Sequence, residues 1–449
     1  MRRHIRRNRH RFFKRAIWRT RLIFWGGAIL VGLVAAVFAK MAESADLFFH
    51  SVIQINPYLP LVITPLGLVL TAYITRHFFN GAEGSGIPQT RAVLSGAGAA
   101  IGNRYLTLKI AIGKLFLCVL GLLFGASVGR VGPTVHIGAA IMVSLGRYTF
   151  IKETYLLRGL IMAGSGAGIA AAFNTPLAGI MFVIEEMWRS FDRRNISMIM
   201  VAIILAGLTA IVVHHSNYDY SIVTTPGHDY LLLAVAVVVC GIVGGLLGGG
   251  FSQVLITASN RLAPYMNSYW VAITFVCGIV IAVTGIISGG SAFGSGYIET
   301  REIVSCAGNA QCLQQPGVLY PVYKMITTIA TYLSGIPAGI FVPSLATGAG
   351  LGRDIAMFFP VELASTIVVI AMVAYFSGVV QTPITAFIIV MEMTHNQDLV
   401  LALMATSLLA SGTSKLICKK PIYTALAENF LAMIADKRVR EESIVVDKN

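Results

Sequence analysis

The chain alternates between long apolar stretches and short polar breaks, and most of the stretches are long enough to form helices in a membrane. A helix that spans the hydrocarbon core needs about 20 predominantly apolar residues. The stretches differ in length, so we expect several of them to tilt, to hold two shorter helices or to cross only half of the bilayer. They cover residues 22–38, 59–74, 157–182, 198–213, 231–255, 270–287, 326–341, 367–391 and 399–409.

Three short segments that contain glycine and proline interrupt this apolar pattern, at residues 84–88, 129–134 and 339–343. Each is typical of a helix that begins within the membrane, where broken backbone is tolerated only if it is buried in protein or lines a polar cavity. Main-chain N–H groups and the positive end of the helix dipole favour an anion at such a start. The pattern therefore predicts a central anion site.

Composition and charge agree with a polytopic membrane protein. Of the 449 residues, 56% are hydrophobic and 12% are charged, and the mean hydropathy of +0.76 is too high for a soluble globular protein. The net charge of +14 would suit nucleic acid, but ten Lys and Arg residues and no acid lie between Arg2 and Arg21. This flank is typical of a cytoplasmic tail that contacts anionic lipid, so we expect lipid and no nucleic acid as partner.

The two halves of the chain carry similar features in the same order. The triplet Gly84-Ser85-Gly86 returns 210 residues later around Ser295, and residues 175–185 resemble residues 382–392 at an offset of 207. A duplicated fold with its substrate site near the midplane is predicted, although similarity alone does not distinguish parallel from inverted repeats. The expected organisation is a basic tail (1–21), a first repeat (22–213), a junction (214–228), a second repeat (229–418), and a pore-contributing helix with a short cytoplasmic tail (419–449).

The reactive side chains form no recognisable catalytic or metal-binding pattern. Cys306 and Cys312 share one polar loop and would pair only if that loop faced an oxidising compartment, while the other cysteines are expected to pack as small hydrophobic residues. No His, Cys and carboxylate cluster has metal-ligand spacing, and no phosphate-binding loop is present. We therefore predict no cofactor, no metal and no enzymatic activity.

The three interrupted segments, together with Tyr423, resemble the anion-contacting segments of the CLC family of chloride channels and proton/chloride exchangers. The resemblance covers roughly residues 20–430. It implies an all-α polytopic membrane protein, a CLC-type duplicated inverted repeat with broken and half-crossing helices. It also implies a homodimer with one ion path in each subunit. The short tails without appended regulatory domains favour the bacterial type, a multi-pass protein of the cell inner membrane.

The same resemblance assigns the residues that contact chloride. Ser85 and Tyr423 would donate hydroxyl hydrogen bonds to a central halide, and main-chain N–H groups would complete a central and an outer site. Partial charges of this kind bind chloride firmly enough to desolvate it and still release it. Backbone donors do not separate chloride from bromide or nitrate. The residues assigned to chloride are Ser85, Tyr423, Ile340, Phe341, Arg130, Val131 and Gly132.

Val131 departs from the family pattern. Most members have a glutamate there, which competes with chloride for the filter and carries the proton, whereas valine has no titratable group. The main hypothesis is passive, channel-like chloride transport that is uncoupled from protons. Three alternatives stay open: the valine was introduced artificially, another carboxylate replaces the glutamate, or Val131 forms a hydrophobic constriction that gates by dewetting.

Five charged residues remain, of which three have two interpretations each and two have a structural one. Glu186 matches the family's internal proton-transfer glutamate, so proton-coupled exchange through Glu186 and another outer acceptor is the alternative function. Charged residues follow Glu186 directly, so an interfacial ion pair without proton transfer is equally open. Arg130 and Lys114 either attract anions to a pore mouth or extend to the interface. Glu185 and Glu392, at equivalent positions of the repeats, are predicted to have a structural role.

Overall fold

The computed structural model describes residues 15–95, 102, 104–149, 151, 153–187, 195–214, 230–306 and 316–446. Within these ranges the secondary structure is helical, with one isolated antiparallel bridge between Gly129 and Gly339. Most of the basic tail and of the expected junction, and also Cys312, lie outside the described residues. The domain boundaries and the pairing of Cys306 therefore stay predictions.

The helices range from one-turn segments to a first helix of 41 residues. The first half comprises α2 (Arg15–Ile55), α3 (Pro60–Phe78), α4 (Ile87–Leu94), α6 (Leu108–Leu123), α7 (Val131–Tyr148), α8 (Thr154–Phe173), α9 (Pro176–Phe182), the π-helical turn η1 (Val183–Met187) and α10 (Ile196–His214). The second half comprises α11 (Tyr230–Leu262), α12 (Trp270–Ile287), α13 (Tyr297–Cys306), α14 (Tyr320–Leu333), α15 (Phe341–Ala356), α16 (Val361–Val380), α17 (Pro383–Thr394), α18 (Val400–Ile417) and α19 (Ile422–Val446).

Eight helices of the described chain are long and apolar enough to cross a membrane, which makes this a multi-pass membrane protein. Two of them lie in the protein interior, since 89% of α8 and 94% of α16 is buried. In the other six, half or less of the residues of the apolar segment are buried, and the rest face the surroundings. The centre of the molecule is thus built from equivalent helices of the two halves.

Two of the long apolar stretches each contain a helix break instead of one continuous helix. Asn174 ends α8 and Gln381 ends α16, both with φ 56 in the left-handed region, and a new helix begins at the proline two residues later in each case. Left-handed backbone is uncommon for residues other than glycine and marks a sharp change of direction. The stretches 157–182 and 367–391 are therefore helix pairs, as the duplication requires.

Reciprocal hydrogen bonds join α9 and α17 across the two halves. The carboxylate of Glu185 accepts from the main-chain N–H groups of Ile384 (3.2 Å) and Thr385 (2.7 Å) at the start of α17. Glu392 accepts in the same way from Leu177 (3.2 Å) and Ala178 (2.8 Å) at the start of α9. A carboxylate at a helix start stabilises the dipole and the N–H groups that the helix leaves without an acceptor. The structural role predicted for the two glutamates is confirmed.

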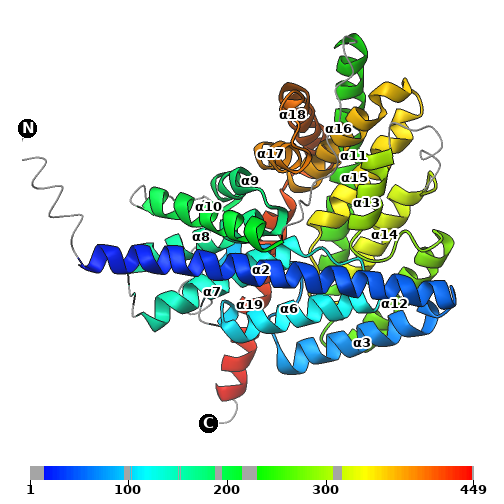
Figure 1. Ribbon diagram of the computed structural model, residues 1–449. Coiled ribbons are helices and arrows are strands. Elements are labelled where there is room, and N and C mark those ends of the chain that lie inside the picture. Colours follow the sequence, from blue (N-terminus) through cyan, green and yellow to red (C-terminus); the bar gives the residue numbers. More distant parts are fainter. Residues whose placement is uncertain are drawn as a thin grey trace, which may run out of the picture.

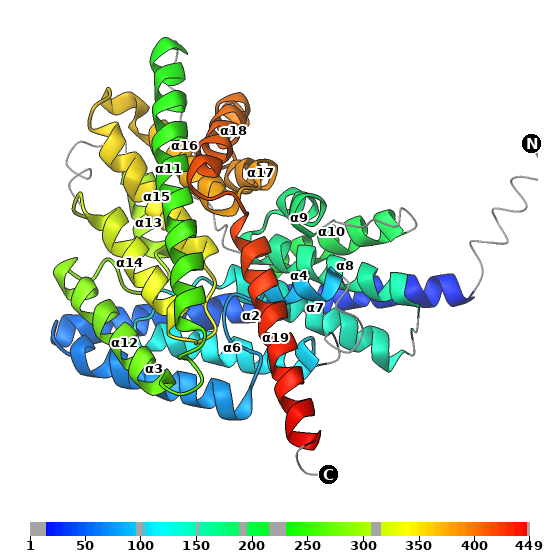
Figure 2. The same ribbon diagram turned by 180° about the vertical axis from the view of Figure 1, so that it is seen from behind.

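In space, α7, α8, α9 and α10 gather on one side of the molecule and α11 to α16 on the other (Figure 1). The long helix α2 runs across both groups. The C-terminal helix α19, drawn in red, passes between the groups in both views (Figure 2). The start of α19 therefore lies at the interface of the two halves, where Tyr423 is placed.

Candidate functional site

Two helices begin at the centre of the protein, one in each half. α7 starts at Val131 after Arg130, and α15 starts at Phe341 after Ile340, and no side chain caps either helix start. The first N–H groups of a helix have no acceptor within the helix itself. Both starts are fully buried, so the two segments present main-chain donors to the protein interior.

The bridge between Gly129 and Gly339 holds these two helix starts together. Gly129 N–H donates to the Gly339 carbonyl at 2.8 Å, and Gly339 N–H donates back at 3.0 Å. A Cβ atom on Gly339 would lie 2.3 Å from the Gly129 oxygen, and one on Gly129 would lie 2.7 Å from the Gly339 oxygen. Because equivalent residues pair in an antiparallel manner, a local two-fold axis passes between them. Glycine is required on both sides for this close approach.

Ser85 lies against the first turn of α7. The preceding and following glycines have left-handed backbone, with φ 66 at Gly84 and φ 98 at Gly86, which turns the chain into α4. A Cβ atom on Gly132 would lie 2.2 Å from Ser85 Oγ, so these residues are in direct contact. Ser85 is completely buried, and its hydroxyl has no hydrogen-bond partner among the described atoms.

Tyr423, the second residue of α19, reaches the same place from the C-terminal end of the chain. Its ring stacks on Phe341 with 6.0 Å between centroids and 18° between planes. Its buried hydroxyl lies close to Ser85 and within electrostatic range of Glu186 and Tyr332, yet completes no hydrogen bond to a described protein atom. The structure thus brings Ser85, Tyr423 and both helix starts together.

This arrangement has the chemistry of an anion site. Buried polar groups are almost always hydrogen-bonded, so two adjacent hydroxyls without a protein acceptor need an explanation. Both hydroxyls and the main-chain N–H groups can act as donors, and an anion is the ligand that accepts from all of them. Glycine at position 132 leaves room for the Ser85 hydroxyl to lie against the first turn of α7.

Lys114 and Arg130 are both buried, so neither extends to the membrane interface, and the attraction of anions to a pore mouth stays a prediction. Lys114 is fully buried, and its ammonium donates to the Gly84 carbonyl at 3.1 Å. The Arg130 guanidinium lies over the Tyr297 ring at 5.4 Å and donates to the Ala39 carbonyl at 3.4 Å. Lys114 therefore holds the loop of Ser85 in place, and Arg130 ties the start of α7 to α2 and α13.

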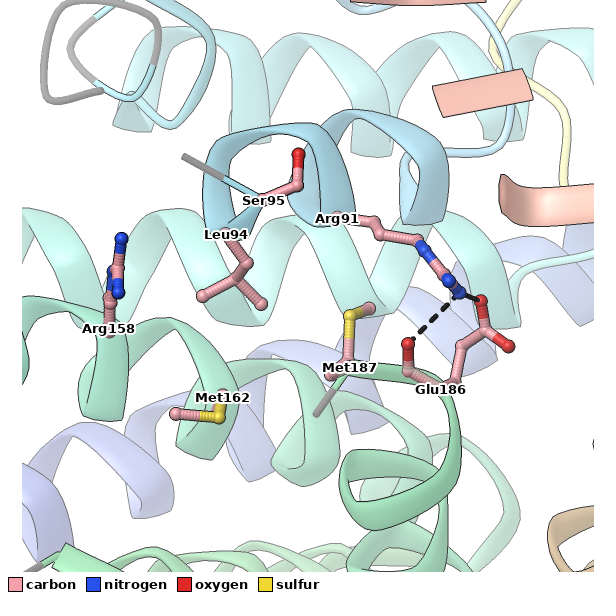
Figure 3. Close-up of a pocket in the computed structure, with 7 residues that line it drawn as sticks. All are labelled: Arg91, Leu94, Ser95, Arg158, Met162, Glu186 and Met187. Carbon is pink, nitrogen blue, oxygen red and sulfur yellow. Dashed lines mark hydrogen bonds and ion pairs between the residues drawn. The ribbon is translucent and has the colours of Figure 1, made fainter. Parts of the chain in front are cut away.

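Glu186 is buried in the π-helical turn η1 and forms an ion pair with Arg91. Arg91 also donates to the Glu186 main-chain carbonyl at 3.0 Å, and both contacts are drawn in Figure 3. Arg158 and Ser95 line the same small cavity of about 20 Å³. The ion pair of Glu186 is present but is buried rather than interfacial, and the role of Glu186 in proton transfer stays a prediction.

The contact with Arg91 was not found by sequence reasoning. The two residues are 95 positions apart, and Arg91 sits in the last turn of the eight-residue helix α4. The available signal for this contact was the position of Arg91, a basic residue one helical turn after the segment 84–88. Val131, the residue that departs from the family pattern, is completely buried at the first position of α7 and contributes no charge.

The fold and the site define a duplicated helical membrane protein whose broken helices converge on a buried polar site. The family described as voltage gated chloride channel matches residues 66–415. The chain belongs to this family, which confirms the resemblance to CLC proteins.

Curated relatives and solved structures agree with this assignment. The H(+)/Cl(-) exchange transporter ClcA of Yersinia pestis bv. Antiqua (strain Angola) is 30% identical over 402 residues, covering 83% of this chain and 79% of the relative. ClcA of Salmonella typhimurium is 28% identical over 452 residues, covering 94% and 90%.

Two solved structures share the fold. A slow cyanobacterial Cl-/H+ antiporter has a TM-score of 0.77 and 24% identity, covering 91% of this chain and 98% of that structure. A CLC-type fluoride/proton antiporter has a TM-score of 0.74 and 21% identity, again covering 91% and 98%. The expected all-α CLC-type inverted repeat is thereby confirmed.

Proposed function

We propose that this protein transports chloride across the cell inner membrane, as a homodimer with one path in each subunit. The observation that carries the proposal is the convergence of two buried hydroxyls, Ser85 and Tyr423, on two uncapped helix starts. In this proposal the hydroxyls and the N–H groups of Ile340 and Phe341 hold a central chloride. The N–H groups of Arg130, Val131 and Gly132 hold an outer one.

We propose exchange for protons as the mode of transport, which was the alternative hypothesis from the sequence. Its support is that the curated relatives described above are named proton/chloride exchangers. Glu186 is the inner candidate for proton transfer because its carboxylate is buried and within electrostatic range of Tyr423. The mode requires a second proton acceptor on the outer side of the chloride site.

Passive conduction is the second candidate, and Val131 is the specific observation that favours it. The first position of α7 carries an aliphatic side chain with no proton to exchange. The ion pair between Arg91 and Glu186 also favours it, because a neighbouring guanidinium stabilises the charged form of a carboxylate.

Simultaneous measurement of chloride and proton flux in proteoliposomes distinguishes the two modes. Exchange predicts that an outward chloride gradient drives steady proton uptake, and that Glu186→Gln abolishes proton uptake while chloride still moves. Glu185→Gln is the matched control, since this neighbouring carboxylate caps α17 and has no contact with Arg91 recorded. Chloride flux without proton movement in the unmodified protein would establish passive conduction, and absence of chloride flux would overturn the proposed function altogether.

A further inference from the structure

The second half contains a counterpart of the Ser85 loop that is built on the same plan. Ser295 is equivalent to Ser85, and the fully buried Lys324 is equivalent to Lys114 at the same offset of 210 residues. The Lys324 ammonium donates to the carbonyls of Ala292 (3.3 Å), Phe293 (2.9 Å) and Gly294 (2.9 Å). Helix α13 begins directly after this loop, as α4 begins after the first.

A carboxylate of the protein itself binds to this second loop. Ser295 donates through Oγ (2.9 Å) and through its main-chain N–H (3.3 Å) to Asp46 Oδ2, which comes from α2. A Cβ atom on Gly294 would lie 1.9 Å from Asp46 Oδ1, so the carboxylate rests directly on the loop. Asp46 is only 4% exposed, and its Oδ1 atom has no hydrogen-bond partner among the described atoms.

His50 connects Asp46 to a second buried carboxylate. Its Nε2 atom lies 3.5 Å from Oε1 of Glu299, which is 7% exposed, and its Nδ1 atom lies 3.9 Å from Asp46 Oδ1. The His50 side chain is 28% exposed, so water reaches this end of the cluster. Asp46, His50 and Glu299 therefore form a continuous titratable cluster, beside the ammonium of Lys324.

The geometry identifies the nitrogen of His50 that binds a proton. Nδ1 lies 2.9 Å from the Asp46 main-chain oxygen, and because a carbonyl only accepts, Nδ1 carries a hydrogen. In neutral His50 the lone pair of Nε2 then faces the Glu299 carboxylate, which is unfavourable. A proton on Nε2 converts this repulsion into an ion pair. This proton also balances the charges of the cluster, because the two negative carboxylates of Asp46 and Glu299 then face two positive groups, Lys324 and the His50 imidazolium.

The cluster lies toward the outer side of the anion path. Asp46 follows Trp18 by 28 residues along α2, a distance of about 42 Å, while the hydrocarbon core is about 30 Å thick. With the basic flank in the cytoplasm, Asp46 and His50 reach the outer interface. Arg130, at the start of α7, contacts both α2 at Ala39 and the ring of Tyr297, which stands between Ser295 and Glu299 in the chain.

We infer that Asp46, His50 and Glu299 form a proton-binding site on the outer side of the chloride path. A proton from external water binds to His50 Nε2 and is shared with Glu299, and it leaves either back to water or, during exchange, onward into the protein, without any other bond changing. The added positive charge strengthens anion binding at the start of α7, and bound chloride strengthens proton binding equally. In the proposed exchange of chloride for protons, the cluster is the outer proton acceptor. This role rests on the proposed function.

The test is chloride binding to the purified protein, measured by titration calorimetry between about pH 10 and about pH 7, because the carboxylates of Glu299 and Asp46 favour the charged form of His50 and move its change of charge above the ordinary range of histidine. We expect the chloride Kd to fall roughly tenfold on acidification. A pH indicator in weakly buffered solution should record proton uptake when chloride is added, a readout that needs no variant. His50→Gln and Glu299→Gln should remove the pH dependence and the proton uptake while leaving chloride binding at about pH 10, where His50 is neutral, within about twofold.

Two matched controls separate the cluster from other titratable groups. His77→Gln removes a histidine with the same Nδ1 contact to a carbonyl four residues earlier, at 3.0 Å, and Glu302→Gln removes an exposed carboxylate from α13. Both variants should behave as the unmodified protein. A pH dependence that survives His50→Gln and Glu299→Gln, or that is absent from the unmodified protein, would overturn the inference.

Flux measurements on the same proteins keep this inference distinct from the proposed function. Proton exchange that persists in both cluster variants would leave the proposed function intact and refute the role of the cluster. Chloride flux without protons, combined with pH-dependent binding that His50→Gln removes, would refute exchange and retain the proton site.

Discussion

The loops around Ser85 and Ser295 are built alike and bind different partners. In each loop a fully buried lysine holds main-chain carbonyls, and a helix begins directly after the loop. Ser295 donates to the carboxylate of Asp46, whereas the Ser85 hydroxyl has no protein acceptor among the described atoms. We conclude that the duplicated loop is an anion-binding loop. One copy is filled by the protein's own carboxylate, and the other is suited to a mobile ion.

The largest effect is expected from removing the carboxylate that fills the second loop. Asp46→Ala takes a negative charge from beside the buried Lys324 and removes the acceptor of Ser295. Breaking a buried charge pair on one side costs about 3–5 kcal/mol. Thermal unfolding in detergent should show this loss, and a change below about 1 kcal/mol would mean that the second loop does not depend on its carboxylate.

In the first loop, truncation of the serine should weaken binding and leave stability unchanged. Ser85→Ala removes a donor that has no protein acceptor, so the free energy of unfolding in chloride-free buffer should change by less than about 0.5 kcal/mol. A hydrogen bond to a charged group contributes about 1.5–3 kcal/mol, so the chloride Kd should rise at least tenfold in calorimetry. Unchanged chloride affinity would separate Ser85 from the anion site.

The opposite result is expected for the equivalent serine of the second loop. Ser295→Ala removes a hydrogen bond to the Asp46 carboxylate, so stability should fall by about 1.5–3 kcal/mol. The chloride Kd at pH 8 should stay within twofold of the unmodified value. If Ser295→Ala instead weakened chloride binding as Ser85→Ala does, the two loops would not differ in the way described.

The smallest effects should come from the reciprocal caps. Glu185→Gln and Glu392→Gln each keep an acceptor oxygen but remove the charge at a helix start, which costs about 0.3–1 kcal/mol. The main-chain contacts are equivalent in the two halves, but Thr385 Oγ1 donates a further hydrogen bond to Glu185 at 2.8 Å, so the unfolding temperature should fall slightly more for Glu185→Gln than for Glu392→Gln. A large difference between the two variants would show that the two-fold relationship does not extend to this interface.

Much of the chloride site could be predicted because its signals are local. Glycine and proline at a helix start act through the backbone, so the segments around Ser85, Val131 and Phe341 are visible in any short window of sequence. The duplication was visible for the same reason, as the offsets of 210 and 207 residues align entire motifs. Asn174 and Gln381, with the proline two residues after each, indicated the helix breaks within long apolar stretches.

The buried ion pairs could not be predicted because they depend on tertiary packing. Asp46 and Ser295 are 249 positions apart, and no local pattern links a carboxylate late in α2 to a loop of the other half. Arg91 and Glu186 are likewise joined only when α4 packs beside the turn η1. Residues such as Lys114 were misread for the same reason. From hydropathy alone a charged residue is expected near the surface of the membrane. In the folded protein a main-chain carbonyl in the interior accepts a hydrogen bond from Lys114, so this residue can be buried.

The most direct test of the account is an anomalous difference map from crystals grown in bromide. The account predicts a bromide peak within hydrogen-bond distance of Ser85 Oγ and the Tyr423 hydroxyl, at the starts of α7 and α15, and no peak at Ser295, where Asp46 is bound. A peak at Ser295, or no peak between Ser85 and Tyr423, would contradict it.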